Sequence, residues 1–268
     1  LQSFNFIFLM PLILLYLLSL VLGAVSLKIL LRGVKKEISL RCILKAYLLS
    51  SMIGVMTPGR IGEFSLVYFL RKYDIPIGTS AAVSVLDKII TLIILMAFSV
   101  WGSFIFMENY ITIMILAASI TGTMIVWFIF ISETGRNLIK SYLFRRITDK
   151  IKGFSKTLNE LAKEKRHILY NVVLTVIRWL LHFASFYVTF FAFDIKLPIF
   201  SLLLLAIVAL IALIPITLGG LGVREVVAVY VFKYVGVKPE IVISVFLFIL
   251  VIKYLSNFAI MIYLAKER

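Results

Sequence analysis

The chain has 268 residues, of which 62% are hydrophobic and 15% are charged, and its mean hydropathy is +1.10. Soluble domains carry roughly 25% charged residues, so this composition excludes an ordinary water-soluble fold. The net charge of +15 is better explained by basic loops at one membrane surface than by a nucleic-acid partner, and none is expected. With one cysteine, Cys42, and two histidines, we expect no metal site, no cofactor and no intrachain disulfide.

Apolar segments long enough to cross a bilayer recur along the chain. Residues 9–22 are apolar but lack a basic flank and a cleavage site, so they indicate a membrane segment rather than a signal peptide. The absence of an initial Met suggests a trimmed or partial N-terminus. The predicted spans are 4–27, 79–106, 111–131, 168–193 and 240–264.

Two further apolar stretches, 40–56 and 200–218, each lead into a glycine-rich turn and a short helix, 62–73 and 223–235. Twelve helical residues cover about 18 Å, and the hydrocarbon core is about 30 Å thick. The short helices therefore cannot cross it. Irregular backbone at membrane depth must be satisfied by protein or line a water-filled cavity.

Two basic segments, 28–45 and 132–167, set the expected topology. Segment 132–167 holds ten Lys/Arg against four Asp/Glu. Its apolar residues recur at helical spacing, so it is either an amphipathic helix on an anionic leaflet or a solvated helical hairpin packed on the bundle. We expect one integral membrane domain over residues 1–268, with halves 1–131 and 168–268 joined by this segment.

The charge distribution favours hairpins over simple crossings. If every apolar segment crossed once, the two basic segments would face opposite sides, against the positive-inside rule. If 40–73 returns to the inner side and 200–235 to the outer side, twenty Lys/Arg lie inside and three outside. The sequence thus predicts an all-α, polytopic transmembrane helical bundle with two re-entrant helical hairpins and with both basic segments cytoplasmic.

The two turns also resemble each other. Residues 59–63 read GRIGE and residues 219–225 read GGLGVRE, and a tyrosine follows each glutamate by five residues. Because the two hairpins would enter from opposite sides, this pattern indicates an inverted repeat with a binding site where the broken helices meet. Chance similarity of two short motifs remains the alternative.

The residue types at the turns suit a phosphate. Helix N-termini expose N–H groups and partial positive charge, glycine lets a ligand approach the backbone, and arginine matches phosphate oxygens. The simpler interpretation is that the glycines permit tight turns and that the glutamates form buried ion pairs with the arginines. The candidate residues are Gly59, Arg60, Gly62, Glu63, Gly219, Gly220, Gly222, Arg224 and Glu225.

Charged residues inside predicted spans are further candidates, since they usually face a protein interior. Lys88 could extend to the inner surface, and its neighbour Asp87 could pair with a basic residue. Arg178 and His182 share one helix face, and of the two we favour Arg178 for an anionic headgroup. Lys253 and Asn257 form a similar pair on the last span. No catalytic residues are proposed.

The segment from Thr57 to Glu63, TPGRIGE, resembles the PGxxGE turn of the flippase-like membrane family of lysylphosphatidylglycerol synthases and UPF0104-type proteins. Residues 30–32 (LLR), 85–88 (VLDK) and 219–225 also resemble that family. The resemblance covers nearly the whole chain. It implies a domain with re-entrant helices that handles an anionic phospholipid or lipid-linked sugar phosphate, with Arg60, Glu63, Arg224 and Glu225 at its paired turns and the Asp87–Lys88 pair in between.

The leading hypothesis is a translocator in the cell membrane. Nothing resembles the aminoacyl-transferase domain of full synthases. Two alternatives stay open: a transferase acting on a lipid-linked substrate, for which no nucleophile–base arrangement is visible, and a non-catalytic scaffold that recruits a partner through 132–167. Expected partners are anionic phospholipid or polyprenyl-linked phosphate, with a homo-oligomer, a synthase or a glycosyltransferase as further candidates.

Overall fold

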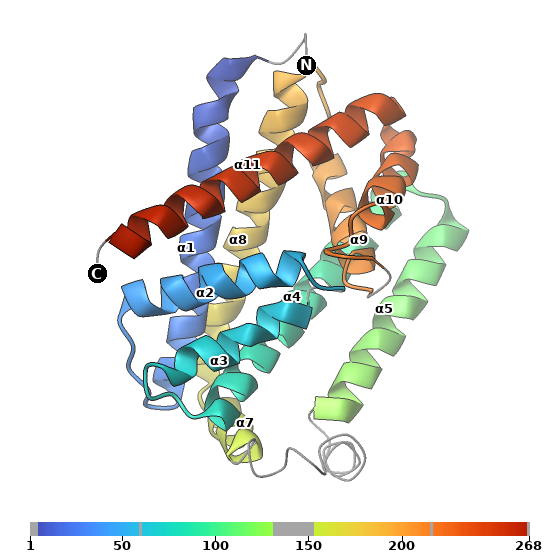
Figure 1. Ribbon diagram of the computed structural model, residues 1–268. Helices are drawn as coiled ribbons and strands as arrows, with labels where there is room; N and C mark the ends of the chain where they lie inside the picture. Colours follow the sequence, from blue (N-terminus) through green and yellow to red (C-terminus); the bar gives the residue numbers. More distant parts are fainter. Residues whose placement is uncertain (1–4, 59–60, 131–152, 215–216, 267–268) are drawn as a thin grey trace.

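The computed structural model describes residues 5–58, 61–130, 153–214 and 217–266, and over these ranges the chain is helical with no strand (Figure 1). Four helices are long and apolar enough to cross a membrane, so the expected multi-pass helical membrane protein is confirmed. They are α1 (Leu9–Gly33), α4 (Ile77–Phe106), α8 (Lys165–Ala192) and α11 (Pro239–Lys266).

The fifth predicted span coincides with α5 (Asn109–Phe130). It has 22 residues, which at about 1.5 Å per residue is about the thickness of the hydrocarbon core. In Figure 1, α5 (green) stands apart from the paired α1 and α8, and it connects to α4 at the upper end of the view. Large apolar side chains such as Ile113, Met114 and Met124 are exposed on it, as expected for a surface that faces lipid.

Helices α1 and α8 lie side by side along much of their length (Figure 1). Small residues let the helices approach closely: Gly23 of α1 packs against the ring of Tyr47, and Gly102 of α4 packs against the backbone of Leu203. At one end of the bundle, the backbone N–H of Asn5 donates to the carbonyl oxygen of Ala192 at 3.1 Å.

The first hairpin-like segment contains α2 (Leu40–Val55), the 3₁₀ turn η2 (Ile61–Ser65) and α3 (Leu66–Arg71). The Ser39 side chain begins α2 by accepting from the N–H of Cys42 at 3.3 Å. The chain then doubles back, because α2 packs against both η2 and α3. Leu66 and Leu70 are buried with Leu30 and Leu31 of α1 in one apolar cluster.

The second such segment contains η3 (Ile199–Leu203), α9 (Leu204–Ile211), α10 (Val223–Phe232) and η4 (Lys233–Val235). Helix α9 ends earlier than the predicted apolar stretch 200–218, and Pro215, which lacks an N–H, follows in the sequence. Helices α9 and α10 pack on each other. Phe190 and Phe232 stack with ring centroids 5.1 Å apart inside the second large apolar cluster.

The tips of the two segments touch. The N–H of Gly219 donates to the carbonyl oxygen of Thr57 at 3.1 Å, and Pro58 and Leu218 form an isolated antiparallel bridge. The two turns that look alike in the sequence are therefore neighbours in space, joined through backbone atoms.

The basic segment 132–167 is described only from Gly153 onward, so the interpretation of residues 131–152 lies outside the described residues. Helix α7 (Phe154–Lys163) packs on α4, with Leu161 fully buried and the Thr157 hydroxyl 3.3 Å from that of Thr79. This part fits a helix packed on the bundle. Helix α8 begins at Lys165, three residues before the predicted span at 168.

Candidate functional site

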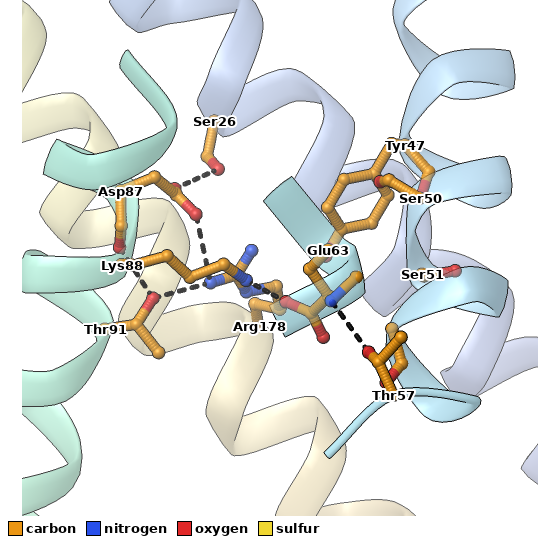
Figure 2. Close-up of polar contacts among 12 residues, drawn as sticks. Ser26, Tyr47, Ser50, Ser51, Thr57, Glu63, Asp87, Lys88, Thr91 and Arg178 are labelled. Carbon is orange, nitrogen blue, oxygen red and sulfur yellow. Dashed lines mark hydrogen bonds and ion pairs between the residues drawn. The ribbon is translucent and has the colours of Figure 1, made fainter. Parts of the chain in front are cut away.

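A cluster of charged and hydroxyl side chains lies among α2, η2, α4 and α8 (Figure 2). Glu63 reaches from η2 to α4, where the ammonium of Lys88 donates to its carboxylate in an ion pair. The exposed fraction is 18% for the Glu63 side chain and 38% for that of Lys88. Lys88 thus pairs across the bundle instead of extending to the membrane surface.

Asp87, on the next position of α4, is almost completely buried at 1% exposure. Its Oδ1 accepts hydrogen bonds from the Ser26 hydroxyl and the Asn171 amide, both at 3.1 Å. The Arg178 guanidinium lies 4.0 Å from Oδ2 and donates to the Thr91 hydroxyl at 3.0 Å (Figure 2). A buried carboxylate is tolerated when such donors and an opposite charge surround it.

The Glu63–Lys88 pair and Asp87 border a small cavity of about 20 Å³, enough for roughly one water molecule. Tyr47, Ser50 and Ser51 on α2 also line it. Ser84, also in its wall, carries a buried hydroxyl with no partner among the described residues. The cluster is therefore a polar pocket inside an otherwise apolar bundle.

The turn that presents Glu63 is fixed by close packing. The Gly62 N–H donates to the Thr57 hydroxyl at 2.7 Å, and that hydroxyl donates to the Gly54 carbonyl at 3.0 Å. A Cβ atom at Gly62 would lie 2.6 Å from the carbonyl oxygen of Ile53. Only glycine fits this contact, so the turn interpretation of Gly62 is supported by the geometry.

In the second turn, the two charged side chains are adjacent in the sequence and pair with each other. The Arg224 guanidinium donates to Oε1 of the adjacent Glu225 at 2.5 and 3.0 Å, and Glu225 Oε2 accepts from the Gly222 N–H at 2.7 Å. Glu225 thereby closes the start of α10 as an N3 residue can. The Arg224 guanidinium also lies 5.6 Å from the ring centroid of Phe246 on α11, a cation–π distance.

Three of the turn glycines have positive φ: Gly219 at 59°, Gly220 at 78° and Gly222 at 83°. Their N–H groups already have acceptors, namely the Thr57 carbonyl, the Thr217 carbonyl and the Glu225 carboxylate. These three glycines thus act as turn formers, and their own N–H groups are occupied inside the protein.

The structure brings several sequence-predicted residues together and separates others. Glu63, Asp87, Lys88 and Arg178 form one cluster, whereas Arg224 and Glu225 form another at the start of α10. Gly59 and Arg60 lie outside the described residues. The polar partners that sequence reasoning missed are uncharged side chains common in any helix: Ser26, Tyr47, Thr91 and Asn171.

Four helices long enough to span a membrane, with buried charges between them, define a multi-pass membrane protein that holds a small polar pocket. The family described as the lysylphosphatidylglycerol synthase TM region matches residues 1–260, so the chain belongs to that family. The resemblance carried by the TPGRIGE turn is thereby confirmed.

Two archaeal relatives are similar to the chain. A UPF0104 membrane protein of Pyrococcus horikoshii is 24% identical over 268 aligned residues, which cover 89% of this chain and 80% of the relative. A UPF0104 membrane protein of Methanothermobacter thermautotrophicus is 29% identical over 100 residues, which cover 37% of this chain and 30% of that relative. No solved structure matches the chain.

Proposed function

We propose that the protein is a flippase-like lipid translocator of the cell membrane, which handles an anionic phospholipid or a lipid-linked sugar phosphate. The observation that carries this proposal is the contact between the two glycine-rich turns, at Thr57–Gly219 and Pro58–Leu218, with a charged cluster beside each. Buried charges in membrane helices are costly and mark sites where ions or charged groups pass or bind.

The two hairpin-like segments support a re-entrant arrangement. Helix α2 doubles back through η2 into α3, α9 packs on α10, and the two tips meet. In the proposed topology residues 28–45 and 132–167 face the cytoplasm, the first hairpin enters from that side and the second from the opposite side. The paired turns then form an inverted repeat within one integral membrane domain, and the headgroup passes between them.

Side chains, rather than backbone N–H groups, carry the proposed phosphate contact. The described turn glycines, Gly62, Gly219, Gly220 and Gly222, donate to protein acceptors, whereas Lys88, Arg178 and Arg224 place cationic groups beside the turns. Glu63, Asp87 and Glu225 hold these cations in place by ion pairing. An approaching phosphate must compete with the carboxylates for these cations. This competition keeps phosphate binding reversible, so that the phosphate can leave toward either side of the membrane.

The test is a headgroup-accessibility assay in proteoliposomes that contain fluorescent phosphatidylglycerol. The protein should make inner-leaflet lipid accessible to a membrane-impermeant quencher, and Arg224→Ala should slow this movement by about tenfold, which corresponds to about 1.4 kcal/mol. Lys233→Ala is the matched control, since Lys233 is exposed at the end of α10, and it should leave the rate unchanged.

Two results would count against the proposal, the first against translocation itself and the second against the role of the charged clusters. Folded wild-type protein that moves neither phosphatidylglycerol nor a polyprenyl-linked phosphate would overturn it. Equal rates for wild type, Arg224→Ala and Lys88→Ala would show that movement does not depend on the charged clusters. If charge reversal in 150–166 abolishes the function of the protein while Arg224→Ala and Lys88→Ala leave it unaffected, this result would instead indicate a scaffold.

A further inference from the structure

A large apolar groove lies between α4 and α5, with a volume of about 630 Å³. Its walls are four residues of α4 and five of α5, namely Ile93, Met96, Ala97 and Val100, and Leu116, Ser119, Ile120, Thr123 and Met124. Ile93 on one wall and Met124 on the other are 44% and 66% exposed. The groove is therefore open at the surface of the bundle.

The shape of the groove follows from the packing of α5. Near the α4–α5 turn, Ile111 and Ile115 pack on a buried cluster that α9 and α10 share, so the two helices are held together at that end. Farther along, α5 stands apart from the bundle (Figure 1). There the Met96 side chain crosses the gap, and its Sδ accepts from the Thr123 hydroxyl at 3.4 Å.

The groove lies at the depth of the lipid tails. On α5 it covers residues 116–124, and Ser119 is the eleventh of the 22 residues of this helix. On α4 it covers residues 93–100 of Ile77–Phe106. The walls are thus about 10–12 Å long. They are continuous with the exposed apolar surface of α5 at Ile113 and Ile125, which faces lipid, so the bilayer interior meets the groove.

The walls also favour an occupant without polar groups. None of the nine residues that line the groove is charged, and the Thr123 hydroxyl donates to the Ser119 carbonyl at 2.8 Å within its own helix. A hydrocarbon chain has no hydrogen-bonding group to satisfy, and it restores the dispersion contacts that an unfilled gap between the helices forfeits. At about 30 Å³ per methylene, which is the volume of a water molecule in the liquid, the groove has room for about twenty methylene groups.

The groove and the charged cluster lie on different faces of α4. Ile93 follows Lys88 by five residues, which corresponds to a rotation of about 140° around a helix with 3.6 residues per turn. We therefore assign the groove to a lipid other than one whose phosphate is held at the charged cluster.

We propose that the groove between α4 and α5 binds the hydrocarbon chain of a resident membrane lipid, which fills the gap and holds α5 against α4. The ligand class is a long, uncharged hydrocarbon chain, recognised independently of its headgroup. The inference goes beyond the proposed translocator function and does not depend on it.

Photolabelling tests the site directly. The full chain is reconstituted with phosphatidylcholine that carries a diazirine midway along one acyl chain, and is then extracted into detergent to remove bulk lipid before irradiation. Peptide mass spectrometry locates the adducts. We expect adducts on both walls, in 93–100 and 116–124, at a yield about tenfold above that on the exposed face of α11 at Leu247, Val251 and Leu255.

Filling the groove should displace the chain. Ala97 is small and exposed in the α4 wall, so Ala97→Phe should lower the yield on both walls about tenfold. Ser119→Phe fills the groove from the α5 wall and should act in the same way. Ala118→Phe is the matched control, because Ala118 is exposed on α5 outside the groove, and it should label like wild type.

A second arm tests recognition of the chain. Phosphatidylglycerol with the same diazirine chain should label the groove as strongly as phosphatidylcholine does, since the walls carry no charge. Labelling that requires one of the two headgroups would contradict recognition through the chain.

The proposal is overturned if wild-type protein is labelled no more in the groove than on α11, a result that does not depend on the folding of any variant. It is also overturned if both filling variants label like wild type, or if the groove is unlabelled and cross-links instead to a second copy of the chain. The translocation assay is read separately. Transport without groove labelling rejects this lipid site alone, and groove labelling without transport rejects the translocator alone.

Discussion

The two turns have similar sequences but arrange their charges differently. Around the first turn, the ion pairs join elements far apart in the chain: Glu63 of η2 to Lys88 of α4, and Asp87 of α4 to Arg178 of α8. Around the second, Arg224 pairs with its own neighbour Glu225. The first cluster therefore connects three helical elements, and the second mainly shapes the start of α10.

This difference has a physical consequence. A pair between distant elements forms only when the fold forms, so breaking it should lower the free energy of unfolding. An adjacent pair can persist in the unfolded chain and contributes less to the difference between the two states. The described tertiary contact of Arg224 is the cation–π approach to Phe246, so the second turn is the better candidate for the part that moves.

The largest effect is expected for Asp87→Ala. Asp87 is 1% exposed, and its loss removes an acceptor from Ser26 and Asn171 and the counter-charge of Arg178. Removing one partner of a buried ion pair costs about 3–5 kcal/mol. The measurement is the free energy of unfolding in mixed micelles with increasing SDS.

Glu160→Ala is the matched control, because Glu160 lies in an exposed pair with Lys156 at 4.0 Å. Exposed pairs contribute about 0–1 kcal/mol. Equal losses in the two variants would show that the Asp87 network does not hold α4 and α8 together.

The next prediction compares the destabilisation caused by glycine substitutions in the two turns. Gly62→Ala would place a Cβ atom against the Ile53 carbonyl oxygen, whereas at Gly222 nothing lies within 4 Å but φ is +83°. We expect about 1–3 kcal/mol of destabilisation for Gly62→Ala from overpacking and a similar loss for Gly222→Ala from backbone strain.

Asn substitution distinguishes the two causes in the same unfolding measurement. Asparagine tolerates positive φ better than alanine does, so Gly222→Asn should recover part of the loss. At Gly62 the larger asparagine side chain should instead increase the loss in the free energy of unfolding. Recovery at both positions would contradict the close-packing explanation for Gly62.

Much of the fold followed from the sequence, because apolar length and glycine positions are local signals. The predicted first residue agrees with the structure to within three residues for five helices, namely α2, α4, α8, α10 and α11. The early end of α9 at Ile211 was not predicted, since hydropathy alone does not distinguish an apolar helix from an apolar turn. Pro215 was the local signal in the sequence that a helix ends before it.

The candidate site was less predictable. Intramembrane charge identified Asp87, Lys88 and Arg178 because such residues are rare. The sequence suggested Arg60 as a partner of Glu63, and Arg60 lies outside the described residues. The structure adds Lys88 as a partner of Glu63, a contact between elements that no local pattern contains. Uncharged partners such as Asn171 were missed because a single Asn or Ser in a helix carries no signal until its neighbours are known.

Double-mutant cycles give a third, smaller effect that measures the comparison directly. Glu63→Gln with Lys88→Gln should show a coupling of about 1 kcal/mol, because the two residues meet only when η2 packs near α4. Glu225→Gln with Arg224→Gln should show less, because those residues are adjacent in any conformation. The free energy of unfolding is measured for all variants, and a larger coupling at the second turn would reverse the assignment of the mobile element.

The smallest effect concerns the hydroxyl that fixes the first turn. Thr57 accepts from the Gly62 N–H and donates to the Gly54 carbonyl, and Thr57→Val keeps the shape while removing both hydrogen bonds. The expected loss is about 1 kcal/mol, with Thr57→Ser as the control that retains the hydroxyl. Because the Thr57 carbonyl also holds Gly219, loosening this turn should raise hydrogen exchange at the Gly219 amide as well as at Gly62. Exchange that rises at Gly62 alone would mean that the two tips move independently, and the backbone contact between them would then not couple the hairpins.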